Sequence, residues 1–310
     1  MEGGTADGHR DLGHAEDYLG ALFQSICSLR TPTLPHNPYD TQPESRFFRA
    51  LTEHVPTSLA IREAMRYVLL RDLLLVRGGG RIWDVGCGDG SFWASIPERE
   101  GYRIDGIELD PTEAALGRAS GVFTDLSVAD ITRTEPEPGV YDLVLGNCSL
   151  EHIPDIREAL VRMRQGLRAD GRLILFVPAP QWTRSLAPVR LLNHLGQRAG
   201  MALGYAIDGF FQHHHLYGHP VWAGLLASLG YVNIQAQGLG GSHLNRLFAR
   251  HLMAAAPEFI CKTVIGHYPH EILRRRSLSA ACLAELHALP LTPGAPEVVE
   301  YAILADRGPA

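Results

Sequence analysis

A short glycine-rich segment carries the residues best suited to bind a ligand. Residues 81–93 read RIWDVGCGDGSFW, an apolar run that leads into the pattern G-x-G-x-G. Glycines at the end of a strand let a ligand approach the main chain, because a Cβ atom there would block it. Asp84 and Asp89 add two carboxylates to the same turn. The segment predicts a ligand-binding turn between a strand and a helix, and the alternative is a tight turn that binds nothing.

Charge distinguishes the ligands that use such a turn, which are dinucleotides and S-adenosylmethionine (SAM). Glu108 lies 22 residues after Gly86 and could bind the ribose hydroxyls of either ligand. The pyrophosphate of a dinucleotide would lie beside Asp84 and Asp89, a repulsion of several kcal/mol at roughly 4–6 Å. SAM has no phosphate and carries an ammonium and a sulfonium, so the acids favour SAM and disfavour a dehydrogenase.

Alternating strands and helices follow the turn. Short apolar segments rich in β-formers occupy residues 103–109, 122–130, 141–149 and 172–179, and helical patterns begin at Pro111 and cover 154–168. Continuously apolar strands separated by helices are typical of a parallel sheet covered on both faces. The chain is therefore predicted to have a doubly wound α/β core.

These motifs together resemble the class I (Rossmann-like) SAM-dependent methyltransferases of the small-molecule type, over about residues 80–180. RIWDVGCGDG resembles their first motif, GIELDP the second, and YDLVLGNCSLEHIPD the fourth strand with its following loop. The resemblance implies a mostly parallel seven-stranded sheet of order 3-2-1-4-5-7-6 with the last strand antiparallel. YVNIQAQG and VVEYAILAD can supply its last two strands.

The resemblance also implies the contacts of the cofactor, SAM, whose product is S-adenosylhomocysteine. The implied residues are Asp84, Gly86 and Gly88 at the methionine end, Glu108 and Leu109 at the ribose, Asp130 and Ile131 at the adenine, and Asn147 near the methyl group. Two of them have structural alternatives. Asp84 could cap the next helix, and Asp130 could be a surface turn residue.

A histidine after the fourth strand is the first candidate for a general base. His152 would lie at the carboxyl edge of the sheet, where ligands bind, and its pKa suits proton transfer near neutral pH. Alternatively, Glu151 and His152 orient the following helix. Some similar methyltransferases bind a metal through a Glu-x-x-Glu-His pattern, but this chain has Cys148 in place of the first glutamate. Because Mg²⁺ prefers oxygen ligands, no metal ion is expected.

A second cluster of histidines occupies the segment FFQHHHLYGHP. On an extended chain His213, His215 and Tyr217 would face one way and His214 the other. Adjacent histidines rarely converge on one metal ion, and the resemblance places such a segment in the wall of the substrate pocket. His152, His213, His215 and Tyr217 are therefore the catalytic candidates.

The organisation predicted for the chain is one domain with an arm and helical additions. Residues 1–44 form a flexible N-terminal arm, and 45–310 form the methyltransferase domain with cap helices 45–77 and inserts 181–212 and 242–288. Both inserts carry Leu, Met, Phe and Ala at helical spacing. They predict a lid over a hydrophobic small molecule, such as a natural product, a quinone or terpenoid, or a lipid-like compound; ordinary packing against the core or a dimer partner is the alternative.

Composition limits the classes of molecule that the protein is expected to bind. A net charge of −6 argues against nucleic acid, and no apolar run reaches the roughly 18–20 residues that span a bilayer. A cytoplasmic protein is expected, with peripheral membrane contact and a homodimer left open. The predicted function is methylation of an oxygen or carbon of a hydrophobic small molecule. The alternative is a non-methylating SAM-binding protein, or the same fold with a different reaction.

Overall fold

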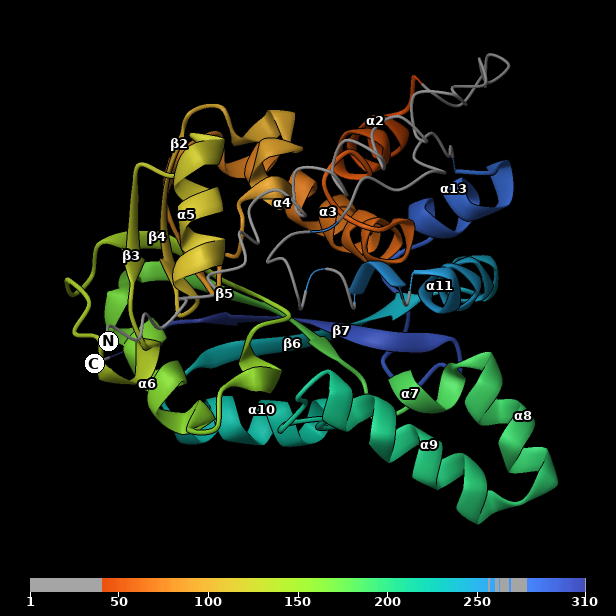
Figure 1. Ribbon diagram of the computed structural model, residues 1–310. Helices are drawn as coiled ribbons and strands as arrows, with labels where there is room; N and C mark the ends of the chain where they lie inside the picture. The colour runs from red at the N-terminus through yellow and green to blue at the C-terminus, as the bar shows by residue number, and fades with distance from the viewer. Residues whose placement is uncertain (1–40, 256, 260–261, 263–267, 269–277, 310) are drawn as a thin grey trace, which may run out of the picture.

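The fold is built on one mixed sheet, which positions the residues of the candidate site. The computed structural model describes residues 41–255, 257–259, 262, 268 and 278–309, and these form a seven-stranded sheet with helices on both faces (Figure 1). The strands are β1 Gly80–Val85, β2 Tyr102–Glu108, β3 Asp125–Val128, β4 Tyr141–Asn147, β5 Leu167–Pro178, β6 Val232–Gly240 and β7 Val298–Asp306. Their order is β3-β2-β1-β4-β5-β7-β6, which confirms the predicted topology.

Strand direction brings several chain segments to one edge of the sheet. The strands β1 to β5 pair in parallel, whereas β7 is antiparallel to both β5 and β6. The strand order reverses between β1 and β4, and a crevice forms at such a switch point outside the carboxyl ends of the strands. Because β7 is reversed, its beginning also lies at this edge, where Glu300 pairs with Pro178 of β5.

The helices match the predicted alternation, with small differences at the ends. They are α2 Pro43–Leu51, α3 Thr57–Arg77, α4 Ser91–Ala94, α5 Pro111–Ser120, α6 Ile156–Gly166, α7 Trp182–Ser185, α8 Ala187–Leu195, α9 Gln197–Phe210, α10 His219–Ser228, α11 Ser242–Ala254 and α13 Ala280–His287. Short 3-10 helices are η1 Pro97–Arg99, η2 Ile131–Arg133 and η3 Leu150–His152. Helix α2 begins at Pro43, two residues before the predicted boundary. Residues 1–40 of the predicted arm lie outside the described residues.

Alternation along the strands divides the apolar core into two layers. Ile82 of β1 packs with the helices α2, α3, α11 and α13 on one face, and its neighbour Trp83 packs with α6 and α10 on the other. Successive side chains of a strand point to opposite faces, so a sheet covered on both sides needs apolar residues at consecutive positions. The run RIWDV supplies them.

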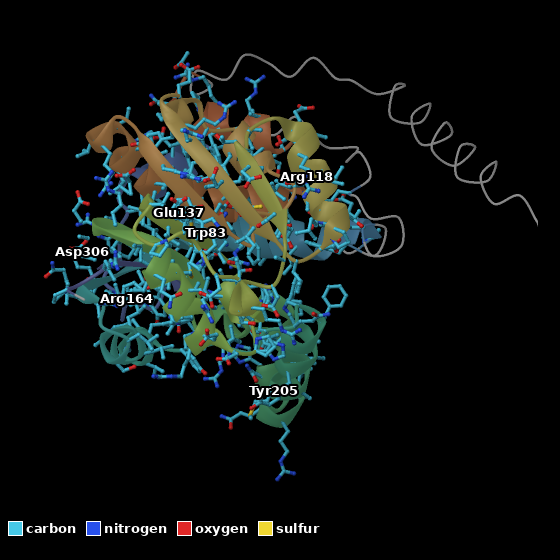
Figure 2. The ribbon with its side chains drawn as sticks, turned by 90° about the vertical axis from the view of Figure 1, so that its left-hand side faces the viewer. Trp83, Arg118, Glu137, Arg164, Tyr205 and Asp306 are labelled. Atoms are coloured by element: carbon cyan, nitrogen blue, oxygen red, sulfur yellow. The ribbon has the colours of Figure 1, made fainter. Side chains whose placement is uncertain are left out.

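The first insert forms the helices α7, α8 and α9, which project from the sheet beside α11 (Figure 1). Several large apolar side chains here face outward, including Leu195 at 78% exposure and Tyr205 at 69%. Figure 2 shows Tyr205 far from the sheet, at the tip of this projection. Of the second insert, the structure describes mainly α11 and α13. Across the described ranges, no helix is long and apolar enough to cross a membrane.

Candidate active site

The glycine turn follows β1 and leaves the main chain accessible. Gly86 has φ 72°, and a Cβ atom there would lie 2.4 Å from the Cβ of Ser149, in the loop after β4. Gly88 has φ 57°, and its nearest neighbour for a Cβ atom would be Oε2 of Glu113 at 3.9 Å. Both positions need glycine for their backbone conformation, because other residues are strained at positive φ. At Gly88 there is also room for a ligand.

The buried carboxylate of Asp84 lies at the end of β1. Its Oδ2 accepts a hydrogen bond of 2.7 Å from the indole Nε1 of Trp93, whereas Oδ1 has no partner among the described residues. Burial raises the pKa of Asp84 to about 7, the charges of Glu108 and Glu63 add to this, and the Trp93 hydrogen bond opposes it. An ammonium group at this place would satisfy Oδ1 and offset the burial of the charge. The helix-capping alternative for Asp84 is wrong, because Asp89 accepts from the Ser91 amide instead.

Glu108 connects the end of β2 to the glycine turn. Its Oε2 accepts from the Gly88 amide at 2.8 Å, and its Oε1 accepts from the amides of Leu109 at 2.8 Å and Asp110 at 3.0 Å. Three main-chain donors thus fix the carboxylate, which keeps acceptor capacity for hydroxyl groups. The side chain of Leu109 is 68% exposed beside it and provides an apolar surface.

Asp130 and Ile131 follow β3, and most of their contacts stabilise the local fold. Asp130 Oδ1 caps η2 by accepting from the amide and the hydroxyl of Thr132, at 2.9 and 2.7 Å. These hydrogen bonds from Thr132 lower the pKa of Asp130. Ile131 is 5% exposed and packs in the core with Val85. An adenine contact would therefore use Oδ2 of Asp130, which faces Arg133 at 3.6 Å.

A polar network joins the cap helix α3 to the end of β4. Asn147 donates from Nδ2 to Oε2 of Glu63 at 3.0 Å, and its Oδ1 accepts from Nη1 of Arg66 at 3.0 Å. Arg66 Nη1 also donates to Oε1 of Glu63 at 2.6 Å. The residue predicted to lie near the methyl group is therefore held by two charged side chains of α3.

Two buried arginines of α3 share one carboxylate of β7. Glu300 is completely buried and pairs with Arg62 Nε and with Arg66 Nε, the latter at 2.8 Å. Burial alone would raise the pKa of Glu300, but the two guanidinium groups overcome this effect and hold it below its usual value. Arg66 also donates to Sγ of Cys148 at 2.9 Å, and Cys148 itself has a left-handed backbone with φ 50°.

Glu63 is the carboxylate of this network that retains access to the site. Its side chain is 18% exposed, compared with complete burial for Glu300. Burial raises its pKa, and the charge of Arg66 opposes the shift. Sequence reasoning missed Glu63, Arg62 and Arg66, although a signal exists: three charged residues, at i, i+1 and i+4, interrupt the apolar helix SLAIREAMRYVLL.

His152, in the loop after β4, and His213, in the segment after α9, come together. Their ring centroids are 5.4 Å apart, and Nδ1 of His213 lies 3.3 Å from Oδ1 of Asp208. Glu151 beside them is 1% exposed, and its Oε2 has no partner among the described residues. One ligand atom each from Glu151, His152 and His213 lie within 4.8 Å of one another. A carboxylate with two imidazoles suits a transition metal better than Mg²⁺, so the substitution at Cys148 does not by itself exclude a metal ion.

His215 and Tyr217 pair with each other. The Tyr217 hydroxyl donates to Nδ1 of His215 at 2.9 Å if Nε2 of the same ring, which lies 2.9 Å from the Ile153 carbonyl oxygen, carries the proton. With both nitrogens engaged, His215 ties the histidine segment to the loop after β4. The rings around His213 are different ones, Trp182 at 5.2 Å and Phe211 at 5.8 Å. His215 and Tyr217 therefore contact each other, but His213 does not share their contacts as expected. The reason is that the segment is not a regular extended strand.

These features together define a class of protein. A sheet of this order, a glycine turn after β1 that is open to a ligand, and an acid fixed at the end of β2 are those of a class I SAM-dependent methyltransferase. The chain belongs to the methyltransferase domain family, whose model matches residues 59–236, more than half of its length. SAM is the cofactor of this class, and the unpaired Asp84 oxygen and the open Gly88 fit its ammonium and methionine end.

Individual relatives match over shorter stretches. An uncharacterized methyltransferase of Mycobacterium bovis is 33% identical over 113 residues, which cover 35% of this chain and 56% of the relative. A ubiquinone biosynthesis O-methyltransferase of Sodalis glossinidius is 33% identical over 114 residues, which cover 34% of this chain and 45% of that protein. The chain thus spans about half the length of the curated relatives it matches. A solved methyltransferase from Mesorhizobium loti has a TM-score of 0.48 at 17% identity, covering 79% of this chain and 99% of that one.

Proposed function

We propose that the protein transfers the methyl group of SAM to an oxygen or carbon of a hydrophobic small molecule. The observation that carries this proposal is an aromatic wall next to the end of β4. Trp182 packs edge-on against Phe211 and lies 6.2 Å from Phe248, measured between ring centroids. The Arg62 guanidinium lies over the rings of Trp182 and Phe248 and 3.6 Å from the Cys148 sulfur. Apolar rings thus border the place where the methyl group is expected.

In this proposal the chain's own residues bind and orient the reactants. SAM, when bound, supplies a methyl group activated by its sulfonium. Asp84 pairs with the ammonium, Glu108 with the ribose, and Asn147 lines the methyl position. Glu63 is the carboxylate nearest to Asn147 and is the proposed acceptor of a proton from the substrate, with His152 and His213 as the alternatives.

The direct test uses radiolabelled SAM and fractionated metabolite extracts. Transfer of label to an extractable apolar product supports the proposal, and the product's structure identifies the methylated atom. Release of S-adenosylhomocysteine with any acceptor separates a methyltransferase from a non-methylating SAM-binding protein. If SAM binds but no extract yields S-adenosylhomocysteine, the second function is favoured.

SAM is expected to stabilise the folded protein. At a ligand concentration 100 times its Kd, the free energy of unfolding should rise by about 2.7 kcal/mol, because SAM binds the folded state alone. NAD at the same concentration should give no shift, since its pyrophosphate would approach Asp84 and Asp89. Denaturant unfolding with each ligand measures both effects. A folded sample that responds to NAD and not to SAM would contradict the cofactor assignment.

The Glu108→Ala substitution is expected to weaken SAM binding roughly 100-fold, because it removes two charge-assisted hydrogen bonds worth about 1.5 kcal/mol each. Isothermal titration measures the loss. Glu137→Ala is the matched control, because Glu137 is exposed and makes no ion pair within the described ranges. Unchanged affinity in Glu108→Ala would show that another residue binds the ribose.

The cellular location and the oligomeric state of the protein stay predictions. The exposed apolar side chains of α8 and α9, which include Leu195, Met201, Tyr205 and Phe210, support a contact with a second copy or with a membrane surface. The cytoplasmic location proposed for the protein rests on the sequence.

A further inference from the structure

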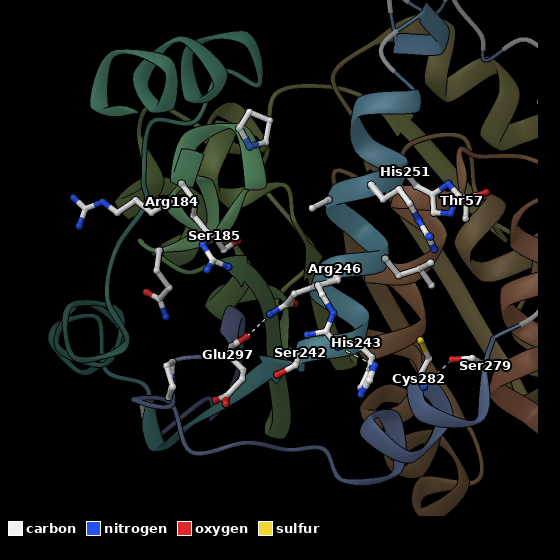
Figure 3. Close-up of a pocket in the computed structure, with 18 of the residues that line it drawn as sticks. Thr57, Arg184, Ser185, Ser242, His243, Arg246, His251, Ser279, Cys282 and Glu297 are labelled. Atoms are coloured by element: carbon white, nitrogen blue, oxygen red, sulfur yellow. Dashed lines mark hydrogen bonds between the residues drawn. The ribbon is translucent and has the colours of Figure 1, made fainter. Parts of the chain in front are cut away.

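A basic groove lies between the first insert and α11. It has a volume of about 1410 Å³ and is bordered by α7, α8, α11 and the segment before β7 (Figure 3). Its charged side chains are Arg184, Arg190, Arg246 and Arg250, and Glu297 is the one acid among the described residues that line it. The whole chain has a net charge of −6, so this local excess of positive charge is not a consequence of composition. Such a concave basic surface attracts anions.

The arginines of the groove lack acidic partners. Within the described ranges, Arg184, Arg190 and Arg250 make no ion pair or hydrogen bond, and Arg246 contacts only Nδ1 of His243, at 3.0 Å. Elsewhere in the chain arginines are often doubly paired, as Arg162 is with Glu135 and Glu158. The guanidinium donors of the groove are therefore available to a ligand, and Figure 3 shows Arg184 and Arg246 on its opposite walls.

The groove is adjacent to the proposed methyl-transfer site. Helices α7 and α11, which border it, also supply Trp182 and Phe248, the rings that cover Arg62. Its floor is the segment that leads into β7, where Asn245 Nδ2 donates to the Glu297 carbonyl oxygen at 2.7 Å. Glu300 of the buried network follows three residues later. At about 3.3 Å per strand residue, the groove floor lies about 10 Å from that network.

We propose that this groove binds a phosphate or diphosphate group of the methyl acceptor, an inference that rests on the function proposed above. Guanidinium groups recognise phosphate through paired, charge-assisted hydrogen bonds, and four of them on facing walls match a group with several charges. Leu191 and Leu247, which also line the groove, would contact the apolar part of the same molecule. The acceptor class is then a phosphorylated apolar compound.

The test is titration with inorganic pyrophosphate. The wild type should bind it saturably, and added salt should weaken binding because the arginines are exposed. The Arg246→Gln/Arg250→Gln variant should bind roughly 100-fold more weakly, since two charge-assisted contacts are lost. The variant Arg184→Gln/Arg190→Gln tests the opposite wall in the same way. The control Arg103→Gln/Arg157→Gln removes two exposed arginines outside the groove and should bind as the wild type does.

Two further measurements separate the outcomes. SAM affinity should be unchanged in the groove variants, which shows that they are folded; if the wild type itself fails to bind SAM, the proposed function fails independently of the groove. The second measurement tests cosedimentation of the protein with vesicles of phosphatidylglycerol in phosphatidylcholine. If the wild type cosediments with these vesicles, the groove variants do not, and the wild type does not bind pyrophosphate, the phosphate is that of a lipid headgroup. Absence of both interactions, or equal binding by the groove variants and the control, would overturn the proposal.

Discussion

Replacing Glu300 with glutamine is expected to lower the free energy of unfolding by about 3–5 kcal/mol, because it leaves the buried charge of Arg62 without a counterion and leaves Arg66 with Glu63 alone. Arg66 has a side-chain exposure of 3% and Arg62 of 11%, and Glu300 is the carboxylate they share. Glutamine keeps the size of the side chain but cannot neutralise two guanidinium groups. Urea denaturation at neutral pH measures the effect.

The Glu297→Gln variant is the matched control for this prediction. Glu297 precedes β7 by one residue, and its carboxylate has no partner within the described ranges, so its loss should change stability by less than about 0.5 kcal/mol. Because the pKa of Glu300 is lowered, its contribution is present above the unfolded value of about 4.3 and disappears as pH falls through the folded value. Equal stability of the Glu300 and Glu297 variants at neutral pH would show that the arginines are compensated in another way.

The Glu63→Gln substitution is expected to reduce turnover by roughly 10²- to 10⁴-fold, the range typical for loss of a general base. Glutamine keeps the size of the side chain and can accept one of the two hydrogen bonds, from Arg66 or from Asn147, but it cannot accept a proton. Since burial raises the pKa of Glu63, the wild-type rate should rise as pH increases through a value above 4.5, and the variant should lose this step. Initial rates across a pH series, with the acceptor identified from labelled SAM, make the measurement.

SAM affinity and the histidines provide the controls for Glu63. An unchanged Kd for SAM with a reduced kcat assigns Glu63 to proton transfer. A raised Kd with unchanged kcat would instead make it a partner of the SAM ammonium and would contradict the assignment. The variants His152→Ala and His213→Phe test the competing bases, and a loss of at least roughly 100-fold in either one, with Glu63→Gln near wild type, would place the base in the histidine pair.

The sequence alone was sufficient to predict the sheet and the cofactor turn. Residues 81–93 combine a continuously apolar strand with glycines at positive φ, and both properties follow from local backbone geometry and burial on two faces. The strand order was predicted through the resemblance, and the structure confirms it. Local hydrogen-bonding roles were less accessible, since Asp84 accepts from the Trp93 indole, whereas the Ser91 amide at the start of α4 donates to Asp89.

The charged network beside Asn147 was decided by tertiary structure. Arg66 and Glu300 are 234 residues apart in the chain, and either one alone has the sequence character of an ordinary surface charge. They meet because α3 packs on one face of the sheet with Arg66 near the carboxyl edge, and because β7 runs in reverse, which puts its first residues at that edge. The same packing sets the distances between Glu63 and Asn147 and between His152 and His213. Burial and Coulomb energy depend on such distances in space, whereas the periodicity that predicts strands and helices depends only on neighbours along the chain.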